Sequence, residues 1–370
     1  MKKALYIGLM SGTSMDGIDA GLFAITDRRC RLEAAESASY PAELRQALHA
    51  ATRDPAACGV DSLGHLDHWV GECFLQAAER LLERSGTDRA RVRAIGSHGQ
   101  TVRHLPRAER PFTLQIGDPN IIAAGTGITT VADFRRRDLA LGGEGAPLAS
   151  GFHRAYLSDP NENRVILNIG GIANITILPA YGGTVSGFDT GPGNGLLDAW
   201  VQHTKGEPFD AGGHWSDSGQ AEPELLEALL RDPYFASAPP KSTGFEHFNL
   251  QWLQQHLAGL PREPAAANVQ ATLAALSARS IAGAVRRHAP ATERVLACGG
   301  GVHNDALMRC LAAELGPVRL DTTAAAGVDP AWVEAATFAW LAKRCLEGKP
   351  GNLPAVTGAS AEAVLGAIYR

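Results

Sequence analysis

Glycine gathers at the ends of short apolar runs, and this placement constrains the fold more than any other feature of the chain. The sequence holds 41 glycines in 370 residues, about 11% where ~7% is usual. Several clusters directly follow strand-like segments, so we expect them where strands end and where backbone can approach a ligand. The clusters lie at 8–17, 96–99, 142–145, 170–171, 187–195 and 299–301.

The remaining composition is that of a globular chain with a small-molecule partner. A length of 370 residues exceeds one typical domain, so two lobes are expected. No apolar run approaches the roughly 18 residues that cross a bilayer, and a net charge of -5 offers no basic surface for nucleic acid or an anionic membrane. The six cysteines form no C-x-x-C pair, which favours a reducing cytoplasm over a disulfide framework.

Strand and helix signals alternate along the chain, which predicts an α/β fold. Two segments, 4–25 and 164–178, each consist of an apolar strand, a turn with glycine and a second strand, which indicates an internal duplication. Two unrelated hairpins would look similar. A helix is also expected after Asp329-Pro330, with Asp as the cap and Pro at the first helical position. Further helices are expected at 63–84, 196–203 and 269–288.

The densest cluster, GLMSGTSMDGID at 8–19, combines glycines, hydroxyls and two carboxylates. Glycine lets backbone amides approach a phosphate, hydroxyls add donors, and an acid can hold magnesium through its waters. An ordinary glycine-rich hairpin is the alternative. Neither the P-loop pattern nor the dinucleotide-binding pattern occurs in the chain, so a phosphate site must be of another kind.

Polar side chains near strand ends supply candidates for chemistry. Asp189 stands before a glycine-rich turn, where a carboxylate can reach a bound water as a general base; a helix cap or Asx turn is the alternative. The strings 97–101 and 133–137 suit a sugar or a carboxylate, although a structural role for His98 and a solvated face for the arginines compete. Glu334 is most simply a favourable charge for the helix dipole.

Eight strings together closely resemble the anhydro-N-acetylmuramic acid kinases, a family of the sugar kinase, heat-shock chaperone and actin superfamily. They occur in order over nearly the whole chain, at 8–19, 97–101, 133–135, 142–148, 168–174, 188–194, 240–244 and 298–304. The resemblance implies two ribonuclease-H-like lobes, the actin-like ATPase fold, with ATP in the cleft between them. Lobe I would comprise 1–130 with about 352–370, and lobe II 131–351.

The resemblance also implies which residues hold ATP and its Mg²⁺. The expected ATP contacts are Gly12, Thr13, Ser14, Met15, Asp16, Gly17, Ile18, Asp19, Asn168, Gly170, Gly171, Asn174, Gly299, Gly300, Gly301 and Asn304. The expected sugar contacts are Ser97, His98, Gln100, Thr101, Asp133, Arg135, Glu144 and Glu334. Most superfamily members carry Asp where this chain has Met10, so Asp16 is the expected metal ligand instead.

The family's substrate, 1,6-anhydro-N-acetylmuramic acid, has O6 closed onto its anomeric carbon and therefore has no free 6-hydroxyl. The resemblance implies that water adds at C1 while O6 takes the γ-phosphate of ATP, with Asp189 as the base. The products would be N-acetylmuramic acid 6-phosphate and ADP, in cell-wall peptidoglycan recycling. A homodimer is expected from the resemblance, in the cytoplasm.

Two other functions remain open, and Glu144 departs from the family's sequence pattern. An ordinary hexose or N-acetylhexosamine kinase of the same fold would use Asp189 on a sugar hydroxyl. A nucleotide-driven binding protein would turn over ATP without sugar. Glu144 stands where the family pattern has Gln and adds negative charge near the lactyl carboxylate of the sugar, a charge that Arg135 or Arg136 would have to offset.

Overall fold

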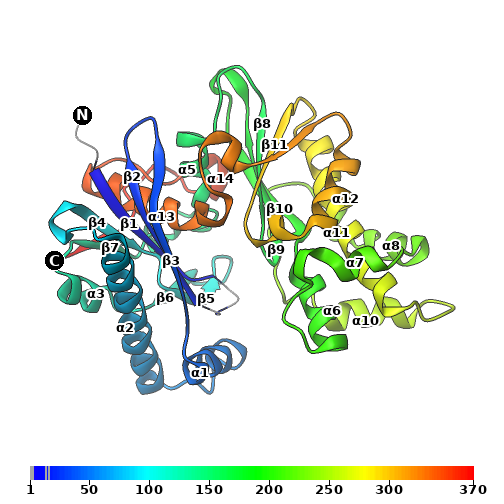
Figure 1. The fold of residues 1–370 in the computed structure, drawn as a ribbon, viewed down its shortest axis with the longest axis horizontal. Helices are drawn as coiled ribbons and strands as arrows, with labels where there is room; N and C mark the ends of the chain where they lie inside the picture. The colour runs from blue at the N-terminus through cyan, green and yellow to red at the C-terminus, as the bar shows by residue number, and fades with distance from the viewer. Residues whose placement is uncertain (1–3, 13–14, 16) are drawn as a thin grey trace. The chain divides into compact units, whose positions relative to one another are not determined.

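The computed structural model describes residues 4–12, 15 and 17–370 (Figure 1). The chain divides into two compact units, Met1–Tyr156 with Trp332–Arg370, and Leu157–Ala331. The boundaries therefore differ from the expected 130 and 351. The reason is that β7 (Thr130–Ala132) pairs with the first sheet, and that the helix α13 (Val333–Leu346) packs on that sheet.

The first unit is built on a six-stranded sheet in the order β13-β7-β4-β1-β2-β3. The first three strands of the chain pair antiparallel, and β1 then pairs parallel with β4, which pairs parallel with β7. Besides β7, its strands are β1 (Ala4–Met10), β2 (Gly17–Ile25), β3 (Cys30–Ser39), β4 (Val92–Ser97) and β13 (Ala367–Tyr369).

The second unit repeats this topology in a five-stranded sheet of order β10-β9-β8-β11-β12. Again the first three strands are antiparallel and the last two add in parallel. The first five strands of the first sheet and the five strands of the second thus share the order 3-2-1-4-5 of a ribonuclease-H-like fold. This repeat agrees with the duplication that the two strand-turn-strand segments indicated. The strands are β8 (Arg164–Ile169), β9 (Ile172–Leu178), β10 (Ser186–Pro192), β11 (Arg294–Cys298) and β12 (Arg319–Thr322).

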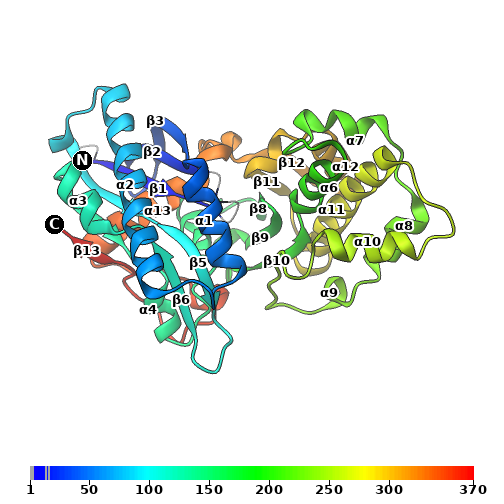
Figure 2. The same cartoon turned by 90° about the horizontal axis from the view of Figure 1, so that it is seen from below.

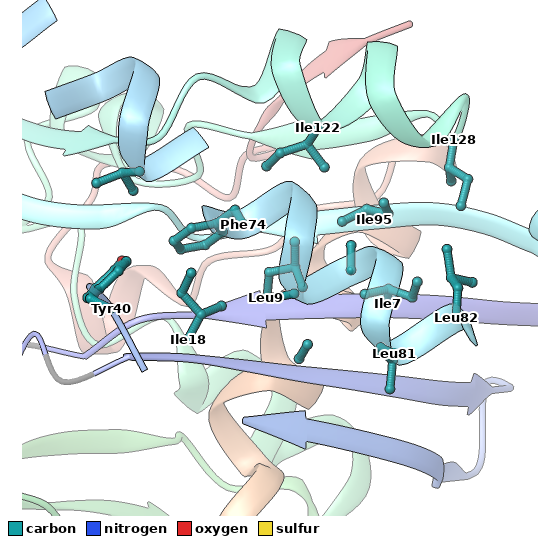
Figure 3. Close-up of a cluster of buried hydrophobic side chains, with 14 of the residues drawn as sticks. Ile7, Leu9, Ile18, Tyr40, Phe74, Leu81, Leu82, Ile95, Ile122 and Ile128 are labelled. Carbon is teal, nitrogen blue, oxygen red and sulfur yellow. The ribbon is translucent and has the colours of Figure 1, made fainter. Parts of the chain in front are cut away.

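Helices cover both faces of the first sheet. Alternate β1 residues, Ile7 and Leu9, join a buried cluster with Phe74 and Leu81 of the long helix α2 (Val60–Ser85), as Figure 3 shows. The residue between them, Gly8, lies against the backbone of α13. Since successive residues of a strand point to opposite faces, α2 and α13 lie on opposite sides of the sheet.

The second unit has two apolar cores. One face of its sheet packs on α11 (Ala266–His288) and α12 (Asp305–Leu315). The other core joins α11 to three further helices, α6 (Gly195–Lys205), α8 (Pro223–Leu230) and α10 (Leu250–Ala258). Figure 2 shows α8 and α10 next to one another. This helical cluster follows directly on β10, so it supports the turn that comes after Asp189.

The expected helices are confirmed as α2, α6 and α11, with one difference after Asp329. Asp329 accepts a hydrogen bond from Ala331 N, but the capped segment is a 3-10 turn, Pro330–Trp332, and α13 begins at Val333. None of the helices described is long and apolar enough to cross a membrane. The remaining elements are α1 (Ala42–Arg53), β5 (Gln100–Leu105), β6 (Phe112–Ile116), α3 (Pro119–Thr126), α4 (Arg136–Ala140), α5 (Ala149–Tyr156), α7 (His214–Ser218), α9 (Pro233–Ala236) and α14 (Pro354–Thr357).

We expect acid to destabilise the first unit through a buried histidine on α5. Burial lowers the pKa of His153 to about 3. The unfolded chain takes up a proton below about 6.5 and the folded chain does not, so stability falls from about pH 6.5 toward 3, by ~1.4 kcal/mol per pH unit for one group. Urea unfolding at several pH values measures this. Between pH 6.5 and 3 the free energy of unfolding should fall less steeply with decreasing pH in His153→Gln than in the wild type. Equal slopes in the two proteins would contradict the prediction.

Candidate active site

Five residues of the first glycine-rich segment that were predicted to contact ATP are described by the structure: Gly12, Met15, Gly17, Ile18 and Asp19. Met15 and Ile18 are buried in the core of the first unit, so any contact they make with a ligand is through their main chain. Met15 also has a φ of 56°, a left-handed conformation that is costly for a residue with a side chain. Asp19 is exposed on β2 and accepts a hydrogen bond from Ser37. Thr13, Ser14 and Asp16 lie outside the described residues.

Gln100, on β5 of a separate two-stranded sheet, bonds to Ser11 and Gly12 of this segment. Its side chain is fully buried, and Nε2 donates to the carbonyl oxygens of Gly12 (3.1 Å) and Thr101 (3.3 Å). Its Oε1 accepts from the hydroxyls of Ser11 (2.7 Å) and Tyr40 (3.5 Å). The amide predicted to contact sugar is thus engaged in supporting the glycine-rich loop. The bonds to Ser11 and Tyr40 join positions 89 and 60 residues away, which no local pattern reveals.

His98 and Arg135 form a pair in the first unit. The Nε and NH2 groups of Arg135 lie 3.0 and 2.9 Å from Nε2 of His98, and NH1 donates to the carbonyl of Gly145 (2.7 Å). Burial, and then the charge of Arg135, hold the pKa of His98 well below its usual range. A neutral ring accepts the arginine donors at Nε2, so His98 orients the guanidinium rather than acting as an acid.

The other polar residues of these two strings lie on separate strands or turns. Ser97 ends β4, and its buried Oγ has no hydrogen-bond partner among the described residues. Thr101 accepts a hydrogen bond from Gln115 of β6. Asp133 lies 3.6 Å from Arg136, and burial raises the pKa of its carboxyl while Arg136 opposes that rise. Arg136 is therefore engaged with Asp133.

The segment 142–148 corrects one expectation. Glu144 pairs with Arg107, at 2.8 Å from Nε and 2.7 Å from NH2, and not with Arg135 or Arg136. Arg107 lies in the connection between β5 and β6, where sequence alone gave no sign of a partner for Glu144. The segment itself is held by Asp138, which is fully buried and accepts from Gly145 N, Asn352 Nδ2 and Thr357 Oγ1.

Glu334 lies in the first turn of α13, as the helix-dipole interpretation expects. Its charge also acts on Arg135. Burial lowers the pKa of Arg135 to about 10, while Glu334 and Asp138 oppose that shift. Glu334 and Arg135, predicted separately from distant strings, are thus electrostatic neighbours in the first unit.

In the second unit, three predicted residues form one row across the sheet. Asn168 of β8 pairs directly with Asn174 of β9, and Asn174 pairs with Asp189 of β10. Residues directly opposite each other in an antiparallel pair place their side chains on the same face. The row therefore presents two amides and one carboxylate, all half-buried, on one face of the sheet.

The turn after β8 binds the turn after Asp189. The carbonyl of Gly170 accepts from Asn194 N (2.8 Å), and the carbonyl of Gly171 accepts from the amides of Gly193 and Gly195 (3.0 Å each). A side chain at Gly193 would lie 2.3 Å from the oxygen of Gly170, so only glycine permits this contact. The two predicted glycine-rich turns are consequently one rigid structure.

A segment that the sequence analysis did not assign to the site encloses Asp189. Asp189 N donates to Lys241 O (3.2 Å), Thr243 N donates to Asp189 Oδ2 (3.1 Å), and Tyr234 donates its hydroxyl to Asp189 O (2.6 Å). Burial lowers the pKa of the Lys241 ammonium, Arg287 adds to this, and Asp189 opposes it. The family resemblance includes the string 240–244, but no contact between this string and Asp189 was predicted from the sequence.

Two buried polar atoms near Asp189 have no hydrogen-bond partner among the described residues. They are Oδ1 of Asn194 and Oγ1 of Thr243. Buried polar atoms in native proteins are nearly always paired, so such atoms indicate where a water or a ligand binds. A polar ligand beside Asp189 fits this pair of atoms.

The third glycine-rich segment follows β11. A side chain at Gly301 would collide with Ile169, whereas one at Gly300 would meet nothing within 4 Å. The backbone at Gly300 is therefore open to a flat ligand. Gly299 has a φ of 83° and approaches Asn168, so this segment adjoins the row of Asn168, Asn174 and Asp189. Asn304 has a structural role as well, because it caps α12 through Leu307 N.

Within the described part of the chain, no group of three or more His, Cys, Asp or Glu residues is placed to hold a metal ion.

Comparison with known proteins decides the family. The model for anhydro-N-acetylmuramic acid kinase matches residues 4–370. The chain belongs to this family. The enzyme of that name from Xanthomonas campestris is 52% identical over 99% of this chain and 97% of its own, and that from Shewanella putrefaciens is 52% identical over 99% and 98%. The kinase and phosphotransferase predictions and the α/β fold are confirmed.

Among solved structures, component A of (R)-2-hydroxyglutaryl-CoA dehydratase from Acidaminococcus fermentans overlaps 91% of this chain and 96% of its own. The TM-score is 0.48 at 12% identity. This overlap is too loose to carry an argument, so membership of the kinase family rests on the full-length match instead.

Proposed function

We propose that this protein is an ATP-dependent kinase that converts 1,6-anhydro-N-acetylmuramic acid and water to N-acetylmuramic acid 6-phosphate, with ADP as the second product, in peptidoglycan recycling. Membership of the family supports the activity. The observation that carries the site is the carboxylate of Asp189, aligned with two asparagines and bonded to Thr243, whose buried hydroxyl has no hydrogen-bond partner among the described residues.

In the proposed reaction, Asp189 removes one proton from a water whose oxygen attacks C1. The C1–O6 bond breaks, and O6 forms a bond to the γ-phosphorus of ATP. The bond from that phosphorus to the ADP oxygen then breaks. Because phosphorus captures the departing O6, one carboxylate suffices where most glycosidases use two. The Thr243 amide orients the carboxylate by its hydrogen bond to Oδ2.

The glycine-rich segments suit ATP. The backbone at Gly170 and at Gly300 leaves space for phosphate and a flat ring, and Asn168 and Asn174 supply amides in the adjoining strands. We assign the first phosphate contact to the segment 12–19 and the metal to Asp16. Mg²⁺, bound with ATP, would neutralise charge on the transferring phosphoryl group.

The product of the reaction tests the proposal. The purified protein is incubated with ATP, magnesium and the anhydro sugar, and the sugar product is measured by mass spectrometry. The expected product gains both a phosphate group and a water. Gain of phosphate alone indicates an ordinary sugar kinase, and ATP hydrolysis without sugar indicates a nucleotide-driven binding protein. Either result would overturn the proposal.

We expect Arg107 to set the affinity for the anionic sugar by neutralising Glu144. Arg107→Met removes the partner of the Glu144 carboxylate, which lies close enough to His104 to affect its pKa, so the lactyl carboxylate is repelled. The KM for the sugar should rise about threefold to tenfold, the size of an exposed charge interaction. Steady-state kinetics at saturating ATP measures it.

Two further variants test whether the rise in KM comes from the unpaired charge of Glu144. Glu144→Gln in the Arg107→Met background should restore the KM, because it removes the unpaired charge. Arg110→Met changes another exposed arginine of the same connection and should leave the KM near that of the wild type. An Arg107→Met effect that persists in the double variant would reject neutralisation as the cause.

We further propose that the enzyme acts in the cytoplasm, where ATP is available, and that it is a homodimer, as the family resemblance suggests. Sedimentation velocity of the purified chain measures the oligomeric state. A single monomeric species at working concentration would contradict the dimer and leave the catalytic proposal unaffected.

A further inference from the structure

The Thr243 backbone is fixed beside the proposed base. Its amide donates to Oδ2 of Asp189, and two residues earlier the carbonyl of Lys241 accepts from Asp189 N. Lys241 is itself held, because its Nζ donates to Tyr234 O (2.9 Å) and lies 4.5 Å from the Tyr234 ring centre. This part of the chain therefore keeps one position relative to the carboxylate.

The Thr243 amide is hydrogen-bonded, but the Thr243 hydroxyl is not. Oγ1 is buried and makes no hydrogen bond to the residues that the structure describes. Leaving a hydroxyl buried and unpaired reduces stability, since its bonds to water are lost and not replaced. Two other buried threonines of this unit are paired: Thr190 donates to Ala173 O, and Thr272 donates to Asn268 O. The unpaired Thr243 hydroxyl therefore indicates that a water or a ligand binds beside it.

We propose that the Thr243 hydroxyl holds the water that attacks the sugar, which makes Thr243 a catalytic residue together with Asp189. This inference rests on the proposed function. The amide and the hydroxyl belong to one residue, so a water bonded to the Asp189 carboxylate lies within reach of Oγ1.

Two anchors fix the orientation of a water molecule where one does not. Asp189 accepts one hydrogen of the water and takes that proton as the water's oxygen bonds to C1. Oγ1 accepts the other hydrogen, which leaves a lone pair of the water directed at C1. Holding reacting atoms in line is worth a large part of a catalytic barrier. The C1–O6 bond breaks and O6 bonds to phosphorus as already described, so Thr243 neither gains nor loses an atom.

The inference predicts that stability and activity change in different directions. Thr243→Val replaces only the hydroxyl with a methyl group and keeps the amide that bonds Asp189. We expect turnover to fall by roughly tenfold to a hundredfold, the cost of misplacing a reacting group, with the KM values for ATP and sugar close to wild type. We expect the melting temperature to stay the same or rise, because an unpaired buried hydroxyl is removed. Thr243→Ser, which keeps a hydroxyl, should recover most of the turnover.

Thr272→Val provides the matched control. The hydroxyl of Thr272, a fully buried residue of the second unit, is paired: it accepts from Glu222 N (2.9 Å) and donates to Asn268 O (2.7 Å). The same substitution there breaks two bonds on α11, so it should lower the melting temperature and leave turnover of the folded protein unchanged.

Three results would overturn the inference. Turnover of Thr243→Val equal to that of the wild type removes any catalytic role. A higher KM for the sugar with normal turnover shows that the hydroxyl binds substrate and not the water. A lower melting temperature, with no recovery of turnover in Thr243→Ser, shows a structural role. Failure of the proposed function is recognised separately, because the wild-type product would then lack the added water whatever the variants do.

Discussion

Asp189→Asn is expected to bind ATP normally and to lose turnover by about 10² or more, because an amide cannot take the proton of the attacking water. Asn has nearly the same shape as Asp and can still accept the Thr243 amide hydrogen bond. The row of Asn168, Asn174 and position 189 should thus remain intact. The loss of turnover then comes from a slower chemical step and not from a change in structure.

Turnover and nucleotide affinity are measured separately to test this. Calorimetry with a non-hydrolysable ATP analogue gives the affinity, and product formation gives the turnover. Asp217→Asn, on α7 of the same unit, changes an exposed carboxylate paired with Arg309 and serves as the control that should keep full activity. If Asp189→Asn retained near-normal turnover, Asp189 would not be the base.

Gly8→Ala is expected to lower the free energy of unfolding by about 3 kcal/mol, at the upper end for an overpacked core. A Cβ at Gly8 would lie 1.8 Å from the carbonyl oxygen of Ala335, and one at Gly96 would lie 2.0 Å from that of Phe338. Gly8 and Gly96 are partners on β1 and β4, so together they form the surface on which the α13 backbone rests. Backbone of a packed helix cannot move away as a flexible side chain can.

Urea unfolding of Gly8→Ala measures the loss, with Gly64→Ala as its control. Gly64 is exposed on α2, and a Cβ there meets nothing within 4 Å. Since Ala favours a helix over Gly, the control should gain about 0.5–1 kcal/mol. If both variants lost a similar free energy of unfolding, the effect of Gly8→Ala would not come from close packing against α13.

Much of the fold follows from local sequence. The apolar runs with glycines at their ends gave β1, β4, β8 and β11, and the two strand-turn-strand segments gave the paired hairpins. Strand order needed the structure, because it depends on pairing between distant segments. The boundary of the first unit was missed for the same reason: α13 packs on β1 across more than 300 residues of chain.

In the site too, local sequence patterns predicted some residues, whereas contacts between distant segments were not predicted. Asp189, Asn168 and Asn174 were predicted from their strings, and the sheet places them in one row. The Arg107 partner of Glu144 and the Thr243 amide on Asp189 were not predicted, since each contact joins residues that share no sequence pattern. Gln100 stays a predicted sugar contact, and the hydrogen bond from its amide to the Gly12 carbonyl is a further contact between distant segments that was not predicted.

The central claim is that water enters at C1 while O6 is phosphorylated, and isotopic water tests it most directly. The wild type is run in H₂¹⁸O and quenched early, with unlabelled product incubated in parallel to measure spontaneous exchange at the anomeric carbon. We predict one ¹⁸O at C1 and none in the sugar phosphate group. A phosphorylated sugar without label that keeps its anhydro bridge, or label found in phosphate released from ATP instead, would contradict the account.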